Sequence, residues 1–255
     1  SSLLILLLVL TIGKVNAQSD QFRFQHYSSE NGLIQNTVYD ICQDKYGFIW
    51  LSTKNGVCRY DGYETKVYKP SSFTKTEVVD LSQCIEIDTD GKIVFGTGAG
   101  IFFISPEKDS ITRRVSFASI NYDDIFVNNI FAICPEKNIL WIGTGNGLIR
   151  FDKITGKVKY FNSEALIPGW KSKRCWIKSI IKNDSGSIYI ATQKGLVEMN
   201  TTTFKTNVYS RAGTGKYFID NDYFSSLSFD KKGRLWSGSL RQGVFCMDLQ
   251  SGIYR

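Results

Sequence analysis

The sequence has 255 residues, a formal charge of +7, 14% aromatic residues and only four prolines. This length allows one large all-β domain or two small ones, and the composition excludes a disordered chain. The lysines and arginines are scattered rather than arranged in a stripe, which argues against a track for a nucleic-acid backbone.

The chain opens with an unbroken apolar run at residues 3–10, which Val15-Asn16-Ala17 follows. The run is too short for a comfortable membrane span. Small or apolar residues at the two positions that a signal peptidase reads predict a secretory signal over residues 1–17. A buried or anchoring N-terminal segment is the alternative. We therefore expect residues 18–255 to form the exported domain.

One hairpin pattern then recurs along the chain. In residues 47–60, Ile49, Leu51 and Thr53 alternate with Phe48, Trp50 and Ser52 with a period of two, and Asn55-Gly56 supplies a tight hairpin turn. Four further copies begin at residues 91, 138, 186 and 233, about 45 residues apart. A strand-rich repeat of this length predicts an all-β fold, a β-propeller of four-stranded antiparallel blades. The aligned bulky positions, expected to pack neighbouring blades together rather than to stack on a ligand, are Trp50, Val94, Trp141, Tyr189 and Trp236.

In chain order, a lone strand at residues 22–27 is expected to complete the last blade and close the ring. A turn such as Asp44-Lys45-Tyr46-Gly47 joins the first two strands of a blade. We expect its Asp to cap the turn by accepting backbone N–H bonds, rather than to bind a metal or act as an acid. Five blades are expected, at residues 38–69, 79–115, 128–161, 176–209 and 223–255.

Six cysteines fall mostly in the predicted strands. An even number of cysteines in an exported chain is typical of disulfide bonding. Strand positions, and the lack of a CxxC motif or a nearby His pair, favour free thiols in the core and argue against zinc. The six are Cys42, Cys58, Cys84, Cys134, Cys175 and Cys246.

The long connections between blades and the second-to-third-strand hairpins share one face of a propeller, which we call the rim. Long loops on a rigid scaffold are where binding residues collect. Aromatic rings, amides and cations on these loops suit a carbohydrate, especially an anionic one. A solvated rim with Trp176 in the core is the alternative. The candidate ligand-binding residues are Asn36, Lys54, Asn55, Asn146, Trp170, Lys173, Arg174, Lys194, Asn221, Tyr223 and Arg241.

Nothing in the sequence indicates catalysis. The single histidine is His26, and no Ser-His-Asp arrangement or glycine-rich phosphate loop accompanies it. Carboxylate pairs of a glycosidase are the alternative, but most carboxylates sit at turns or strand ends. We therefore expect no catalytic residue, no metal site and no cofactor in this segment. The candidate carboxylates of this alternative are Glu86, Asp123, Asp124, Asp152 and Asp222.

Residues 24–53 closely resemble the opening of the two-component regulator propeller family. Residues 50–61 (Trp-Leu-Ser-Thr-Lys-Asn-Gly-Val-Cys-Arg-Tyr-Asp) and residues 141–152 (Trp-Ile-Gly-Thr-Gly-Asn-Gly-Leu-Ile-Arg-Phe-Asp) both fit the repeat of that family. The resemblance extends over residues 22–255. It implies a periplasmic sensor of a hybrid two-component system that detects polysaccharide fragments.

In that family, two seven-bladed propellers lead into a β-sandwich, a membrane helix, a histidine kinase, a receiver and a DNA-binding output. The resemblance therefore implies five blades of an expected seven, in the N-terminal segment of a sensor kinase anchored in the inner membrane. It also implies an oligosaccharide ligand, a homodimer formed through the full-length sensor, and membrane contact only through a downstream helix. No nucleic acid is expected on this segment. The alternatives are an exported protein-interaction scaffold and a propeller glycoside hydrolase or lyase.

Overall fold

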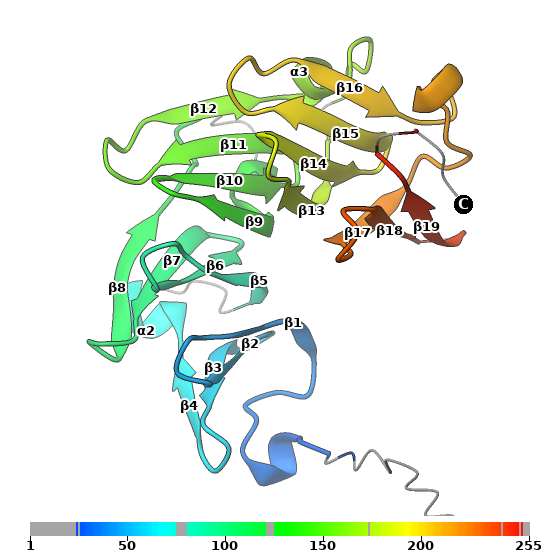
Figure 1. The fold of residues 1–255 in the computed structure, drawn as a ribbon. Helices are drawn as coiled ribbons and strands as arrows, with labels where there is room; N and C mark the ends of the chain where they lie inside the picture. Colours follow the sequence, from blue (N-terminus) through cyan, green and yellow to red (C-terminus); the bar gives the residue numbers. More distant parts are fainter. Residues whose placement is uncertain are drawn as a thin grey trace, which may run out of the picture.

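The chain is an all-β propeller whose blades are antiparallel sheets arranged in an arc (Figure 1). The computed structural model describes residues 24, 26–74, 81–120, 125–172, 174–240, 242–249 and 251. The expected signal at residues 1–17 and half of the expected closing strand at residues 22–27 lie outside these ranges. The total of seven blades stays a prediction.

Each blade takes its strands in chain order, with the first strand innermost and the last outermost (Figure 1). Blade 1 contains β1 (Val38–Gln43), β2 (Ile49–Thr53), β3 (Gly56–Tyr60) and β4 (Thr65–Tyr68). Blade 2 contains β5 (Ser82–Ile87), β6 (Ile93–Thr97), β7 (Gly100–Ser105) and β8 (Ser110–Val115). Blade 3 contains β9 (Ile130–Glu136), β10 (Ile139–Thr144), β11 (Gly147–Asp152) and β12 (Val158–Phe161).

Blades 4 and 5 continue the same order. Blade 4 contains β13 (Ile177–Lys182), β14 (Ser187–Thr192), β15 (Gly195–Asn200) and β16 (Thr206–Tyr209). Blade 5 has three strands within the described residues: β17 (Phe224–Phe229), β18 (Leu235–Ser239) and β19 (Gly243–Met247). Its expected outer strand falls at the chain end, where only residue 251 is described.

Short helical turns occupy the connections between these strands. They are η1 (Ser29–Asn31), α2 (Pro70–Thr74), η2 (Ile125–Asn128), α3 (Ser163–Leu166) and η3 (Gly215–Tyr217). Each of the five precedes the inner strand of a blade, so they build up the rim rather than the opposite edge of the sheets.

A small residue near the end of each second strand lets the blades approach one another. A Cβ added at Gly96 would lie 2.4 Å from Ile130 Cγ2, and one added at Gly143 would lie 2.5 Å from Ile177 Cγ2. Both isoleucines begin the inner strand of the next blade. The packing of neighbouring inner strands therefore depends on the absence of a side chain here. The equivalent positions hold Ser52, Gly96, Gly143, Ala191 and Gly238.

The bulky residue of each repeat packs between blades, as expected, in four of five cases. Trp50, Val94 and Trp141 are fully buried and Tyr189 is 2% exposed. Trp50 lies in one cluster with Phe95 and Phe102 of blade 2. The prediction is wrong for Trp236, which is 38% exposed, because no described blade follows to cover it.

The turn between the first two strands is capped by its acidic residue, as the sequence predicts. Asp44 Oδ1 accepts hydrogen bonds from the backbone N–H groups of Tyr46 (2.9 Å) and Phe48 (3.1 Å). Asp230 caps the equivalent turn of blade 5 in the same way. These carboxylates are therefore parts of the scaffold.

All six cysteines are free thiols in the structure, and Cys58, Cys84, Cys134 and Cys175 are buried. Burial raises the pKa of the Cys134 and Cys175 thiols to about 12. A thiol so far from ionisation packs as a small apolar group and is a poor nucleophile.

Candidate functional site

The first part of the predicted rim lies on blade 1 and is solvent-exposed. Lys54 and Asn55 form the tip of the β2–β3 hairpin, which Thr53 closes by accepting the Asn55 N–H at 3.2 Å. Asn36 lies in the connection before β1, where its Oδ1 accepts the backbone N–H of Ser29 at 2.7 Å. Of the three, only Asn36 has its side chain engaged in a local hydrogen bond.

The second part lies where blades 3 and 4 meet. Asn146 is 6% exposed and forms a parallel bridge with Cys175, which places the β10–β11 hairpin against the connection that precedes β13. Arg174 is exposed, and its guanidinium lies 4.9 Å from the centre of the Phe126 ring. The partly buried Trp170 packs against the core cluster between these blades. This part of the rim presents a cation and an aromatic edge, with Trp170 as its support.

The third part lies between blades 4 and 5. Lys194 Nζ lies 3.9 Å from Asp222 Oδ2. Asn221 is 4% exposed and holds a local turn, since its Oδ1 accepts the Tyr223 N–H at 3.1 Å. Lys173 and Arg241 lie outside the described residues. The structure thus brings those predicted residues that it describes onto one edge of the sheets, in three separate groups.

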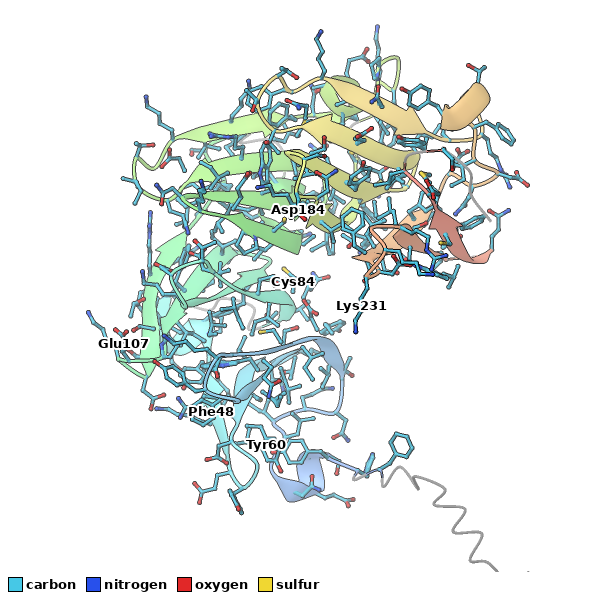
Figure 2. All side chains as sticks on the ribbon, in the orientation of Figure 1. Phe48, Tyr60, Cys84, Glu107, Asp184 and Lys231 are labelled. Carbon is cyan, nitrogen blue, oxygen red and sulfur yellow. The ribbon has the colours of Figure 1, made fainter. Side chains whose placement is uncertain are left out.

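A cavity of about 360 Å³ lies at the centre of the arc and is lined by residues of all five inner strands. We call it the channel. Figure 2 shows Cys84, one of its lining residues, on the inner side of the arc and Glu107 at the outer edge. Its polar lining is Tyr39, Asp40, Gln83, Glu86, Lys178, Ser179, Ser225 and Ser226.

The channel wall is tied together by side chains at one repeated position. Asp40 Oδ2 accepts the Ile85 N–H of the next inner strand at 2.9 Å. Ser179 Oγ accepts the Leu227 N–H at 3.2 Å in the same way. These hydrogen bonds link neighbouring blades, so Asp40 and Ser179 stabilise the packing of the blades as well as lining the channel.

Glu86 and Lys178 are charged groups of the channel whose pKa values burial shifts. Burial, and then the nearby charge of Asp40, raises the pKa of Glu86 to about 7. Burial lowers the pKa of Lys178. The channel therefore contains a carboxyl group that changes its charge near neutral pH.

An aromatic pair lies beside Lys178. The rings of Phe131 and Trp176 are 6.4 Å apart, and Lys178 Nζ is 3.6 Å from the centre of the Phe131 ring. The indole N–H of Trp176 is buried and finds no acceptor among the described residues. Trp176 was expected in the core only in the alternative of a solvated rim, and the structure shows its side chain partly exposed.

The sequence analysis missed the channel lining, although a signal for it exists. The second residue of every inner strand lines the cavity. Once the repeat is aligned, the same position can be read from all five copies. These residues are Tyr39, Gln83, Phe131, Lys178 and Ser225.

The match to a known protein family falls on the first blade and includes the turn of its hairpin. Residues 32–55 match the family model described as two component regulator propeller. This stretch is therefore similar to a two-component regulator propeller repeat. A stretch of 64 residues, 25% of the chain, is 34% identical to histidine kinase P4 of Formosa agariphila. The matched stretch covers 5% of the length of that kinase.

Solved structures share the fold of this chain. The extracellular domains of two putative hybrid two-component systems of B. thetaiotaomicron superpose with TM-scores of 0.72 and 0.70, at 22% and 21% identity. The alignments cover 91% and 92% of this chain but only 31% and 29% of those chains. A catalytically inactive virginiamycin B lyase of Staphylococcus aureus, with an alanine in place of a histidine, superposes with a TM-score of 0.60 at 15% identity, over 83% of this chain and 66% of its own.

Neither a metal centre nor a membrane helix stands out in the described parts of the chain. The described residues contain no group of three or more His, Cys, Asp or Glu side chains that could hold a metal ion. No helix within the described ranges is long and apolar enough to cross a bilayer.

Proposed function

We propose that this chain is a ligand-sensing, non-catalytic propeller segment of an exported sensor in a hybrid two-component system. We further propose that the ligand is an oligosaccharide, neutral or anionic. The likeness to extracellular domains of such systems over nine-tenths of the chain supports the first statement. The kinase to which it would signal, the homodimer and the periplasmic location belong to the same proposal.

The observation that carries the choice of ligand is the polar channel and its position next to the rim. Its wall offers hydroxyl, amide and carboxyl groups from five strands, and an aromatic pair with a cation lies at one side. Sugar hydroxyls match the first set, and the apolar faces of sugar rings match the second. Lys178 and Arg174 would meet acidic substituents.

A lyase function receives less support. The similar lyase is inactive when one histidine is replaced by alanine. The single histidine of the present chain, His26, precedes the first blade, is exposed, and does not line the channel. Glu86 and Asp40 do line the channel, but Asp40 is held by two backbone N–H groups.

Calorimetric titration of the purified protein against a panel of neutral and acidic oligosaccharides tests the proposal. Lys178→Met keeps the apolar stem and removes the charge in the channel, and Arg174→Ala removes the rim cation. Lys157→Ala is the matched control, because Lys157 is exposed on the turn before β12, on the opposite edge of the sheets.

We expect one member of the panel to bind, with an affinity at least tenfold weaker in Lys178→Met or Arg174→Ala and unchanged in Lys157→Ala. Equal affinity in all four proteins would place the ligand outside the channel and rim. Absence of binding by the whole panel would count against an oligosaccharide and in favour of the interaction scaffold.

A further inference from the structure

In three of the five blades, the acidic residue of the turn between the first two strands accepts a hydrogen bond from a tryptophan of the same blade. Trp50 Nε1 donates to Asp44 Oδ2 at 2.9 Å in blade 1. Trp141 Nε1 donates to Glu136 Oε2 at 2.8 Å in blade 3, and Trp236 Nε1 donates to Asp230 Oδ2 at 2.9 Å in blade 5. In each of these blades an indole both fills the space beside the turn and supplies the missing donor.

Blade 2 lacks this ring. Val94 stands at the tryptophan position and has no donor. Asp88 is nevertheless 3% exposed. Its Oδ1 accepts the Thr89 N–H at 2.8 Å and pairs with Lys153 Nζ at 2.5 Å. Its Oδ2 is buried without a hydrogen-bond partner among the described residues. A buried carboxylate oxygen left in this state costs free energy, so it calls for a donor.

A second side chain is also missing at the same place. This second position lies in the turn between the third and fourth strands, nine residues after the glycine that begins the third strand. Its residue has a positive φ in blades 2, 3 and 4. In blade 2 it is Asp109, which pairs with Arg59 of blade 1, and in blade 4 it is Phe204, which packs on Trp141 of blade 3. In blade 3 it is Gly156, and a Cβ there would meet nothing within 4 Å. The gap between blades 2 and 3 is therefore unfilled from both sides.

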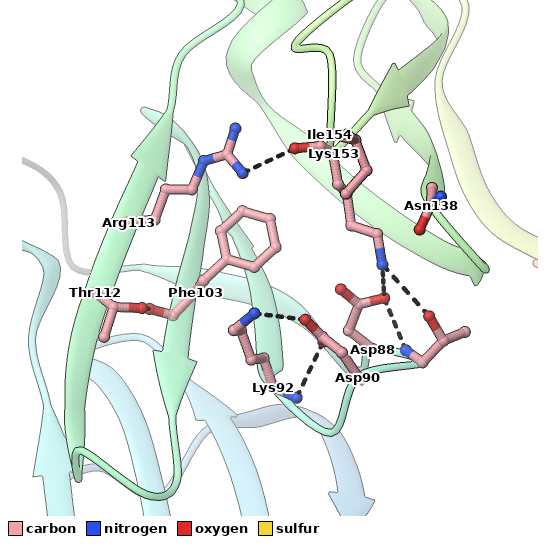
Figure 3. Close-up of a pocket in the computed structure, with 10 residues that line it drawn as sticks. Asp88, Asp90, Lys92, Phe103, Thr112, Arg113, Asn138, Lys153 and Ile154 are labelled. Carbon is pink, nitrogen blue, oxygen red and sulfur yellow. Dashed lines mark hydrogen bonds and ion pairs between the residues drawn. The ribbon is translucent and has the colours of Figure 1, made fainter.

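The result is a cavity of about 360 Å³ between blades 2 and 3, which we call the notch (Figure 3). Asp88, Phe103 and Arg113 of blade 2 line it, with Lys153 and Ile154 of blade 3. In Figure 3 the second oxygen of Asp88 turns toward Phe103, away from Lys153 Nζ. A cavity of this volume accommodates a small ring compound. It lies on the edge of the sheets opposite the rim, so it is distinct from the site proposed above.

The charges around the notch favour an acidic group on the occupant. Lys92 pairs with Asp90 and Lys153 pairs with Asp88. Arg113 has no carboxylate partner within the described ranges. It donates to the Lys153 carbonyl at 3.3 Å and lies 5.5 Å from the centre of the Phe103 ring. One guanidinium is thus left for an anion.

We propose that the notch binds a small planar N–H heterocycle bearing a carboxylate, an indole carboxylate being the model, with its N–H donated to Asp88 Oδ2 and its carboxylate held by Arg113. The ring takes the place that a tryptophan side chain takes in blades 1, 3 and 5. Specificity for this ligand comes from its N–H group and its carboxylate. A ring without the N–H group leaves Asp88 Oδ2 without a hydrogen-bond donor, and a ring without the carboxylate leaves Arg113 without an anion.

Calorimetric titration of the purified protein with indole-3-acetate and with 1-methylindole-3-acetate tests the proposal. We expect indole-3-acetate to bind and the N-methyl compound to bind at least tenfold more weakly. Arg113→Gln should weaken binding by a similar factor. Arg114→Gln should not, because the neighbouring Arg114 bonds to the Ala99 carbonyl near the rim.

Val94→Trp completes the test, because the new indole should occupy the notch. We expect this variant to lose binding and to melt at a higher temperature than the wild type. Absence of binding by the wild type, equal binding of the two ligands, or binding that Val94→Trp retains would each overturn the proposal. The comparison of the two ligands and of the two arginine variants stands even where Val94→Trp fails to fold.

Discussion

Glu86→Gln is expected to change how the stability of this propeller depends on pH. Glu86 lies on the inner strand of blade 2 and faces the channel. Burial, followed by the charge of Asp40, raises its pKa from 4.5 to about 7. The other titratable groups of the channel are Asp40 and Lys178, whose pKa values burial raises and lowers respectively, together with Tyr39 and the buried thiol of Cys84.

The sign follows from proton binding. Between pH 4.5 and 7 the folded protein keeps a proton on Glu86 that the unfolded chain has lost, so the free energy of unfolding falls as the pH rises. Above pH 7 the folded protein carries the full penalty of a buried charge. At about 1.4 kcal/mol per pH unit, the rise of the pKa from 4.5 to about 7 corresponds to roughly 3 kcal/mol, as an upper bound.

Glutamine keeps the shape of the protonated carboxyl group and cannot ionise. We expect Glu86→Gln to match the wild type within about 0.5 kcal/mol at pH 4.5 and to be more stable by about 2–3 kcal/mol at pH 8. Urea unfolding of both proteins from pH 4.5 to 8.5 measures this, with Glu107→Gln, an exposed residue on the β7–β8 turn, as the control. Parallel stability curves for wild type and Glu86→Gln would refute the reasoning.

Two further predictions concern the scaffold. Trp50→Phe, which removes the donor to the buried Asp44 carboxylate, should cost about 2–3 kcal/mol in urea unfolding. Trp236→Phe should cost less than about 1 kcal/mol because its indole is 38% exposed, and equal losses would contradict the account of the acid–indole pairs. Gly96→Ala should cost about 1–3 kcal/mol, since the methyl group meets Ile130 at 2.4 Å. Gly238→Ala meets only the rotatable Ser226 hydroxyl and should cost less than about 1 kcal/mol, and the reverse order of the two glycine variants would refute this explanation of blade packing.

The repeat itself could be read from the sequence because strand and turn chemistry are local. Alternating residues and an Asn-Gly turn define a hairpin without reference to the rest of the chain. Their recurrence then predicts the propeller, since each sheet must bury both faces against neighbours. The capping role of Asp44 was predictable for the same reason, because the backbone N–H groups that donate to its carboxylate lie within four residues of it.

The positions of the rim residues were also predictable, because the alternation of strand direction assigns every loop to one edge of the sheets. Their environments were not. Whether Trp170 packs in the core or faces solvent depends on residues of two other strands. The exposure of Trp236, at a position that is buried in the other repeats, likewise depends on what lies beyond its blade.

The channel and the notch were decided only by tertiary structure. The sequence determined which residue stands at each repeat position. It shows Val94 where blades 1, 3 and 5 have tryptophan, and Gly156 where blades 2 and 4 have a residue with a side chain. It did not say that these two absences, 62 residues apart, meet at one interface. Nor could it place Glu86 beside Asp40, whose charge and shared burial raise its pKa. Both effects arise from distances between blades, which are set when the sheets pack around the channel.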